Sequence, residues 1–436
     1  MKFLLYNLLF LLLSFSLTAQ SYEISEYKAR FERRPFLELN PRLSYSSNLS
    51  NNEFTPNDHQ AGASLSAFWR ESSNLDHRIR SWSVSSNMGF NFRNYDDADE
   101  LDRSNSSMFL QADLEQYNYR ENNKFWGVRG NAFLNSQRSK EGLESADRRT
   151  QFSLIPGVFF GTGRIEFSED ALLANWMMDD LLEADAIATI SPEQRLALAQ
   201  RVTSIIGNRT FDFRRRRIYE LKQLQLLFQE KAIEVKDEFL LFAILNDNWA
   251  FANRATLPHG QRWQFGLDAG GNYTFSSTPF NVDFFTLTAQ PYISFEQAQI
   301  RHNNAATIWR AELSGFYQDL LDEGNSVGPV FNFRSETGAA LRLSHTYVWL
   351  PISRTTLNWR NGVNLFFENF QEDDPFLRQD QLNTQIESVL VWNYFINYNW
   401  RFTLNAGVQA FLTNNEFTST RSVRPFLGIQ MNYAIF

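Results

Sequence analysis

Large apolar residues alternate with small polar ones through most of this chain. In residues 82–92 the even positions include Trp82, Val84, Met88, Phe90 and Phe92, and the odd positions are Ser, Asn and one Gly. The same period of two recurs in residues 261–276, 285–295, 341–349, 357–367 and 400–412. Because successive side chains of a β-strand point to opposite faces, this alternation predicts strands with one apolar and one polar face.

The alternating segments predict about fourteen strands, an even number. They cover about residues 35–47, 60–71, 78–93, 105–120, 123–137, 149–163, 261–276, 281–297, 304–318, 334–349, 354–370, 381–396, 400–413 and 421–436. At about 12 to 17 residues they exceed the soluble mode of about 5 or 6, whereas a tilted membrane strand needs roughly 9–11. Connections average about 10 residues after odd strands and about 4 after even ones, an asymmetry typical of membrane barrels. We therefore predict an all-β transmembrane barrel of antiparallel strands, with a soluble sandwich as the alternative.

Tryptophan and phenylalanine fall at opposite ends of the predicted strands. The tryptophans at the short-connection end are Trp126, Trp263, Trp349, Trp359 and Trp400. The phenylalanines at the other end are Phe92, Phe275, Phe285 and Phe367. Aromatic rings favour the two lipid–water interfaces of a membrane, so this placement predicts two aromatic belts around an aliphatic band.

The first twenty residues differ from the rest of the chain. Lys2 precedes an apolar stretch from Phe3 to Leu17, and Ala19 offers a cleavage site before Gln20. This order is typical of a secretory signal peptide, which we place at residues 1–19; an uncleaved anchor helix is the alternative. The chain has no cysteine and a net charge of −8. These values exclude disulfide scaffolds and thiolate sites, and they argue against a nucleic-acid binder that follows phosphates.

Besides the signal peptide and the alternating strands, the chain has a terminal strand FLGIQMNYAIF that ends on Phe436. In these features it resembles the bacterial outer-membrane β-barrel proteins, in which an aromatic last residue is the assembly signal. Here the apolar residues from Leu427 to Ile435 have the parity opposite to Phe436, which departs from the usual motif. The resemblance implies the outer membrane of a Gram-negative bacterium, with membrane lipid and the barrel-assembly machinery as partners. It specifies an architecture rather than one activity.

Between the sixth and seventh predicted strands, the apolar spacing changes from two to about 3.6 residues. This helical insert, residues 164–260, separates a first half-barrel at 20–163 from a second at 261–436. Ser168 is a candidate N-cap, and Ser191-Pro192-Glu193-Gln194 has the form of a capping box. Further helices are expected at about 213–231 and 237–251. The segment from Gly161 to Ile187 is similar to one in uncharacterised envelope proteins. Because strand six runs towards the short connections, we expect the insert on the periplasmic side.

The insert contains a run of four cations, Arg214, Arg215, Arg216 and Arg217. The run lies near a helix start, where the helix dipole disfavours positive charge. One explanation is ion pairing within the insert, to Asp179, Asp180 and Glu183. The other is contact with an anionic partner, such as a cell-wall polymer or lipid headgroups. The insert as a whole has two corresponding explanations. It is a small bundle that packs on itself or corks the barrel mouth, or it is a docking surface for a partner such as a periplasmic protein.

The polar parity predicts a barrel interior with charges of both signs. Its predicted pore-lining cations are Arg42, Arg70, Arg129, Arg310, Arg342, Arg360, Arg401 and Arg424. Its predicted pore-lining acids are Asp113, Glu115, Asp268, Glu312, Glu368 and Glu387. Opposite charges on facing walls would produce the transverse field of a selective pore. Alternatively, the charges neutralise one another in a closed barrel, because about fourteen strands lie between filled eight-stranded and open sixteen-stranded barrels.

No arrangement of catalytic or metal-binding residues stands out in the sequence. His59 and His77 lie beside predicted loops, His345 shares the apolar parity, and no phosphate loop, dinucleotide fingerprint or zinc spacing is present. We therefore expect no enzymatic activity, no cofactor and no metal site. The sequence favours a porin or transport channel for small solutes with a mixed-charge lumen. The alternative is a closed barrel that anchors an envelope complex through its helical insert.

Overall fold

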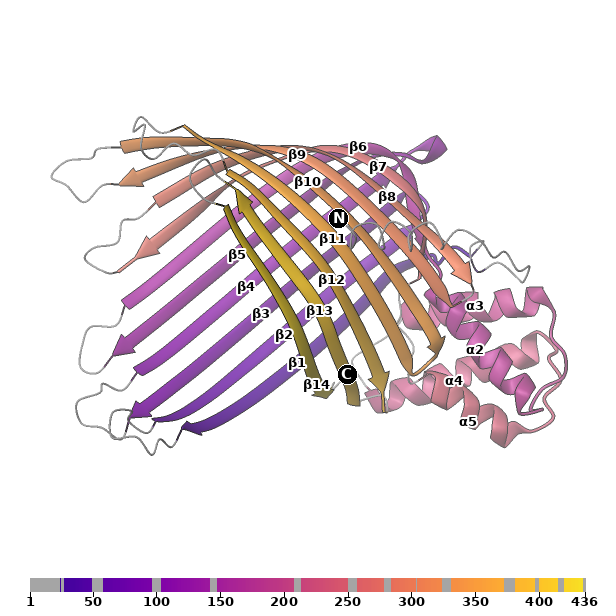
Figure 1. Ribbon diagram of the computed structural model, residues 1–436. Helices are drawn as coiled ribbons and strands as arrows, with labels where there is room; N and C mark the ends of the chain where they lie inside the picture. Colours follow the sequence, from indigo (N-terminus) through magenta and orange to yellow (C-terminus); the bar gives the residue numbers. More distant parts are fainter. Residues whose placement is uncertain are drawn as a thin grey trace.

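The computed structural model contains a fourteen-stranded β-sheet and four α-helices in the residues that it describes (Figure 1). These are residue 24 and residues 27–48, 58–95, 103–141, 147–207, 213–249, 257–277, 284–302, 304–323, 331–371, 381–396, 400–414 and 419–433. The predicted signal peptide at 1–19 and the terminal Phe436 lie outside these residues.

The strands form one antiparallel sheet in chain order. They are β1 (Phe31–Asn48), β2 (Asp58–Leu75), β3 (Arg78–Tyr95), β4 (Arg103–Tyr119), β5 (Lys124–Glu141), β6 (Asp147–Phe167), β7 (Pro258–Ser276), β8 (Phe284–His302), β9 (Ala305–Glu323), β10 (Phe331–Ile352), β11 (Thr355–Gln371), β12 (Gln381–Phe395), β13 (Trp400–Asn414) and β14 (Ser419–Tyr433). Figure 1 shows the sheet rolling round, so that β12 to β14 pass in front of β1 to β5. The predicted fold is confirmed, with fourteen antiparallel strands and a helical segment between the sixth and the seventh.

The connections at the two ends of the sheet differ in length. At one end, residues 76–77, 303–304 and 353–354 are complete connections between strands. At the other end, connections such as 49–57 and 372–380 are longer. We call these the short-turn end and the long-loop end. The helical connection leaves from the short-turn end and spans residues 168–257, because β6 continues to Phe167 and β7 begins at Pro258; the sequence placed it at 164–260.

Neighbouring residues of one strand lie on opposite faces of the sheet. In β7, Leu267 is 46% exposed and Asp268 is 8% exposed; in β6, Phe160 is 64% exposed and Phe159 is 2% exposed. The inner face is identified by contacts between strands that are not neighbours, such as the hydrogen bond from Tyr117 on β4 to Gln264 on β7. The outer face therefore exposes apolar side chains while polar side chains lie inside, the reverse of a soluble protein.

The outer face carries aromatic side chains near both ends of the strands. Trp126, Trp263, Trp349 and Trp400 are exposed near the short-turn end. Phe92, Phe275 and Phe367 are exposed near the long-loop end. Trp359 is less exposed and donates a hydrogen bond to Ser388 Oγ at 3.0 Å. These are the two aromatic belts that the sequence predicted.

Four helices follow β6, namely α2 (Glu169–Glu183), α3 (Pro192–Gly207), α4 (Phe213–Glu230) and α5 (Glu238–Trp249). The predicted capping box at α3 forms in both directions. The backbone N–H of Ser191 donates to Oε1 of Gln194 at 2.8 Å, and the N–H of Gln194 donates to Oγ of Ser191 at 3.3 Å. Two of the donors that a helix start leaves unpaired are thereby satisfied.

Ser168 takes the predicted N-cap position of α2, but its side chain does not cap the helix. Its hydroxyl makes no capping hydrogen bond and lies 3.0 Å from Nδ1 of His259, at the start of β7. The hydroxyl is engaged by a residue 91 positions away, so local sequence could not show this partner. Helix α5 has the cap that its sequence allows, because the Asp237 carboxylate accepts the backbone N–H groups of Phe239 and Leu240.

The helices share an apolar core with two other parts of the chain. The buried residues Leu172, Met177, Leu198 and Leu224 of α2, α3 and α4 belong to it. The start of the described chain enters the same core through Ile24, Tyr27 and Ala29. Ala306 of β9 and Val348 and Leu350 of β10 also contribute, from the inner face near the short-turn end. The helical insert therefore lies against the inside of the sheet at that end, where Figure 1 shows the four helices gathered.

Candidate functional site: the inner face of the sheet

Arg129 and Asp268 form an ion pair on the inner face of the sheet. Both are among the residues that the sequence predicted to line the pore. Arg129 lies on β5 and Asp268 on β7, and Nε of Arg129 donates to Oδ1 of Asp268 at 2.7 Å. The pair passes over Gly157 of the intervening strand, where an added Cβ would collide with the Asp268 carboxylate. The Arg129 guanidinium also stacks on the ring of Tyr292 at 3.9 Å. The cation is thus held on two sides.

A second chain of charges runs across β7, β8 and β9. Glu296 receives Arg262 Nη2 at 2.8 Å on one oxygen and Arg310 Nη2 at 2.8 Å on the other. Arg310 is a predicted pore-lining residue, whereas Arg262 and Glu296 are not among those predicted. Both share the inner parity of Asp268 and Tyr292, so the period-two signal was sufficient to include them.

The ion pairs among these described residues follow the wall of the sheet rather than crossing the lumen. Glu312 on β9 accepts Arg342 Nη1 of the adjacent β10 at 2.6 Å, and the pairs described above join strands at most two apart. This is the neutralising arrangement that the sequence left open as the alternative to charges on facing walls. A field across the lumen is correspondingly smaller than isolated charges would produce.

Asp113 and Glu115, two predicted acids on β4, bond to uncharged groups. The Asn131 amide donates to Asp113 Oδ1 at 2.5 Å, and the Gln111 amide donates to both oxygens of Asp113 at 3.1 Å. The hydroxyl of Tyr117 donates to Glu115. These carboxylates are fixed in orientation by their neighbours on the same wall.

The remaining predicted residues spread round the sheet. Arg360, Glu387 and Arg401 occupy inner positions of β11, β12 and β13. The guanidinium groups of Arg70 and Arg424 lie 5.8 Å and 5.6 Å from the rings of Phe36 and Phe411. Glu368 accepts the Asn383 amide at 3.4 Å. The side chain of Arg42 lies outside the described part of the chain. The inner face is therefore polar all round, and the strand-to-strand ion pairs described above lie on β5 to β10.

Buried aromatic rings fill the inner face of β4 to β8 towards the short-turn end. Tyr117, Phe125, Phe159 and Tyr292 belong to one cluster, and the Arg262 guanidinium stacks on Tyr117 at 4.4 Å. Glycines leave room for these rings, since an added Cβ at 127 or 266 would overlap the ring of Phe159 or Tyr292. The sequence did not indicate this cluster, because its rings occupy the parity that is polar elsewhere.

The insert is tied to the inside of β1 by a buried charge cluster. Arg34 of β1 donates to Asp170 of α2 at 2.5 Å and to Glu169 at 3.2 Å. Asp170 also accepts the hydroxyl of Thr203 on α3, and Thr203 lies 2.5 Å from the hydroxyl of Tyr27. Burial, and then the neighbouring charge of Asp170, raise the pKa of Glu169 to about 7. This cluster joins the start of the chain, the sheet and the insert.

The run Arg214 to Arg217 is described only in part. Arg217 donates to the side-chain oxygen of Asn246 on α5 at 2.9 Å. Two acids that the sequence proposed as partners of the run bond elsewhere: Asp179 pairs with Arg195 at 2.8 Å, and Asp180 accepts the Asn248 amide at 2.6 Å. The side chains of Arg214, Arg215 and Arg216 lie outside the described residues.

Comparison with solved structures yields distant likenesses to autotransporter β domains. No protein-family model and no curated protein matches the chain. The β domain of the Bordetella autotransporter BrkA is similar over 92% of this chain and 98% of that one, at 6% identity and a TM-score of 0.29. The translocator domain of autotransporter NalP from Neisseria meningitidis is similar over 92% and 88%, at 7% identity and a TM-score of 0.23. The fold assignment rests on the ladders, since scores this low carry no argument about function.

Two further searches concern only the described residues. Among them, no helix has the length and apolar character needed to cross a membrane. Nor does that part of the chain bring three or more His, Asp or Glu side chains together as a metal site would require. The acidic stretches 96–102 and 372–374 lie outside it.

Proposed function

We propose that this chain is an outer-membrane β-barrel that passes small hydrophilic solutes, with its polar inner face setting selectivity. The observation that carries the proposal is the inverted arrangement of the two faces. A continuous outer surface of apolar side chains, bounded by aromatic belts, is stable only against lipid. The ladders pair β2 to β13 on both edges and so satisfy their backbone polar groups internally, as a bilayer requires.

The proposed orientation follows from the connections. Barrels of this kind have short periplasmic turns and longer external loops. The long-loop end would therefore face the outside, and the short-turn end the periplasm of a Gram-negative bacterium. The insert and the start of the described chain lie at the short-turn end, so both would be periplasmic.

In this proposal the insert covers part of the periplasmic mouth and limits passage. Its core is shared with Val348 and Leu350 on the inside of β10, and Arg34 holds it to β1. The aromatic cluster around Tyr117 narrows the same half of the interior. The insert would therefore narrow the path for solutes, and we expect the conductance to be low but measurable.

Refolding into lipid vesicles tests the membrane assignment, and planar bilayers test the channel. Folded protein is expected to migrate faster on an unheated gel than on a heated one, and to conduct in discrete steps. Protein that remains soluble without detergent would overturn the membrane assignment. A folded, inserted barrel that shows no conductance at either polarity would overturn the channel.

The second candidate is a closed barrel that anchors an envelope complex through the insert. It is favoured by the exposed apolar side chains Ile218, Tyr219, Phe239 and Phe242 on α4 and α5. A periplasmic protein or a cell-wall polymer would be the partner. This candidate expects inserted protein without conductance, together with loss of partner capture in a Phe239→Ser, Phe242→Ser variant. Neither candidate involves an enzymatic step, a cofactor or a metal.

A further inference from the structure

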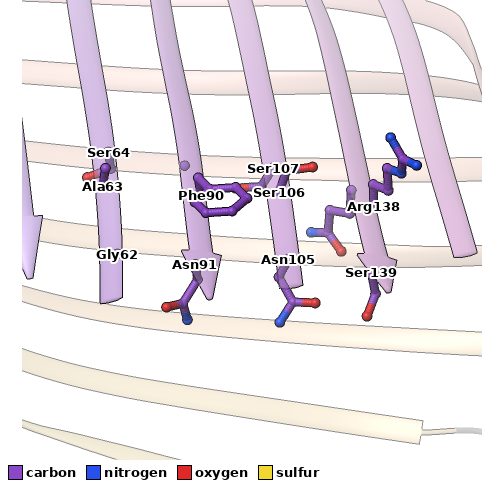
Figure 2. A pocket seen from close by; sticks show the side chains of 12 residues that line it. Gly62, Ala63, Ser64, Phe90, Asn91, Asn105, Ser106, Ser107, Arg138 and Ser139 are labelled. Carbon is purple, nitrogen blue, oxygen red and sulfur yellow. The ribbon is translucent and has the colours of Figure 1, made fainter. Parts of the chain in front are cut away.

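Two cross-strand rows of small polar residues line β2 to β5 near the long-loop end. One row joins Asn91, Asn105 and Ser139, and the next joins Gly89, Ser107 and Gln137. Figure 2 shows Asn91, Asn105 and Ser139 side by side at the ends of neighbouring strands. These residues border a hollow of about 400 Å³, within the range of roughly 300–1,000 Å³ for small-molecule sites.

The rows lie on the inner face of the sheet. Tyr117 of β4 and Arg129 of β5 reach across the concave side to β7, so the odd positions of both strands point inwards. The β4–β5 ladder keeps one register along its whole length. Asn105, Ser107 and Ser139 are therefore inner residues, whereas Ser106 of the same strand faces outwards.

The hollow exists because two of its positions lack side chains. Gly62 and Gly89 belong to the rows on β2 and β3. An added Cβ at Gly89 would stand 3.0 Å from Oγ of Ser107, so even alanine would crowd this neighbour. The floor of the hollow at these glycines is backbone, which lets a ligand approach the wall closely.

The amides at this end differ from the amides deeper inside. Deeper along β4 and β5, Gln111 and Asn131 both donate to Asp113. For Asn91 and Asn105, the structure gives no hydrogen bond from the side chain to any described residue. Each free amide can donate and accept at once, as sugar hydroxyls also do. The two rows themselves contain no ionised side chain. Arg138 borders the hollow from the outer parity of β5, and Arg93 and Arg103 form the next inner row towards the loops.

An aromatic surface adjoins the rows. Phe109 of β4 lies one inner row deeper and Phe133 of β5 two inner rows deeper, with ring centroids 6.5 Å apart and planes 26° from parallel. The faces of such rings are electron-rich and attract the slightly positive C–H edges of a pyranose ring. Amides and hydroxyls next to half-buried rings offer partners both for the hydroxyl groups and for the apolar C–H faces of a sugar.

We propose that this wall is a binding site for neutral saccharides at the mouth opposite the insert. The inference rests on the proposed function, for which it names the class of solute. Uncharged donors and acceptors would select hydroxylated ligands, and Phe109 and Phe133 would retain their apolar faces. Within the two rows, a charged oligosaccharide would lose hydration without gaining an ion pair.

Calorimetric titration of the full chain, folded in detergent micelles, tests the proposal without requiring conduction. The probes are maltohexaose, cellohexaose and xylohexaose, with hexagalacturonate and chitosan hexamer as charged comparators, all at millimolar concentration. We expect at least one neutral probe to bind, and both charged probes to bind at least about tenfold more weakly. Absence of binding by all three neutral probes would overturn the proposal, as would equal binding of a charged one.

Matched variants locate the site. Asn105→Ala is expected to weaken binding about fivefold through loss of its hydrogen bonds, and Phe109→Leu by a similar factor. The controls are Ser104→Ala and Phe92→Leu, which alter outer positions that do not border the hollow and should leave affinity unchanged. Heat-modifiable mobility checks that each variant folds, and Asn91→Ala replaces any that does not. Equal weakening by the controls would overturn the site.

Conductance measured on the same preparations separates the two proposals. Saccharide binding without conductance would leave the site intact and remove the channel. Conductance without saccharide binding would remove the site alone.

Discussion

Val408 and Asn405 lie three positions apart on β13, yet they face different surroundings. Val408 is 43% exposed on the outer face, whereas Asn405 points inwards and is paired with Gly428, beside which there is open space. We expect Val408→Arg to destabilise the folded barrel by roughly 2–4 kcal/mol, since it places a charge in the apolar band.

The matched control on the same strand is Asn405→Arg, which has room in the interior and should cost less than about 1 kcal/mol. Urea titration of both variants in lipid vesicles measures the difference. Equal destabilisation by the two substitutions would contradict the assignment of the faces.

Glu169 predicts how docking of the insert depends on pH. Its pKa is raised from 4.5 to about 7 in the docked state, because burial and Asp170 disfavour its charge. The docked state therefore binds this proton more tightly than the undocked one. Protonated Glu169 therefore stabilises docking of the insert fully below about pH 4.5, and this stabilisation is lost as the pH rises to about 7. Protection of the α2 amides from hydrogen exchange should consequently fall over that interval.

Glu169→Gln mimics the protonated side chain, so it should keep the α2 amides protected from exchange. Above pH 7 we expect the free energy of opening of α2 to be about 1–2 kcal/mol higher in this variant than in the wild type. Glu183→Gln, at the exposed end of the same helix, should leave the pH dependence as it is. Protection that rises with pH in the wild type would contradict this account.

At single positions, the sequence predicted which face of the sheet a side chain is on better than which residue it bonds to. Period two placed Leu267 outside and Asp268 inside, because that period is a property of the strand itself. The partner of Asp268 depends on strand tilt and on the missing side chain of Gly157, neither of which a local pattern contains.

At the scale of elements, the long periodic patterns of apolar residues were sufficient to predict the strands and the helices. Strands such as β10 (Phe331–Ile352) extend over many periods, so their existence was clear while their ends moved by a few residues. The helices of the insert were equally clear, because their apolar spacing and the Ser191 capping box agree. Ser168 failed as a cap because β7 supplies a competing partner, His259.

The connections give a topology that can be tested on cells. An epitope inserted after residue 98, between β3 and β4, should be labelled by antibody on intact cells. The same epitope after residue 210, between α3 and α4, should be labelled only once the outer membrane is permeabilised. Labelling of the second site on intact cells would reverse the proposed orientation.

At the scale of the whole molecule, the main feature that the sequence did not place is the seat of the insert. Nothing local indicates that Tyr27 reaches Ala199 and Thr203, which lie 172 and 176 positions further along the chain. The sequence accordingly left open whether the insert packs only on itself or corks the mouth of the barrel. The shared core with Val348 and Leu350 decides in favour of contact with the sheet interior.

Arg34→Ala should release the insert while the ladders stay intact. The substitution leaves Asp170 and Glu169 without their cation, and breaking a buried pair of this kind costs roughly 3–5 kcal/mol. We expect faster proteolysis within residues 168–257 and, for the proposed channel, a higher conductance.

The neighbouring Arg33→Ala is the control for the Arg34 variant. Arg33 is exposed and pairs with Glu71, so its loss should cost about 0–1 kcal/mol and change neither readout. Unchanged proteolysis in the Arg34 variant would contradict the role given to the buried cluster.

The core of the insert, in which the Tyr27 hydroxyl donates to the Ala199 carbonyl, also constrains the order in which the protein can assemble. Each ladder joins consecutive strands, so the sheet can grow from one hairpin to the next. The insert cannot complete its core in that way, because Val348 and Leu350 are positioned only after β10 has joined. On the proposed orientation, a nascent barrel therefore carries an unseated helical unit into the periplasm. We expect arrested assembly to be visible as protease-sensitive helices on an otherwise resistant sheet.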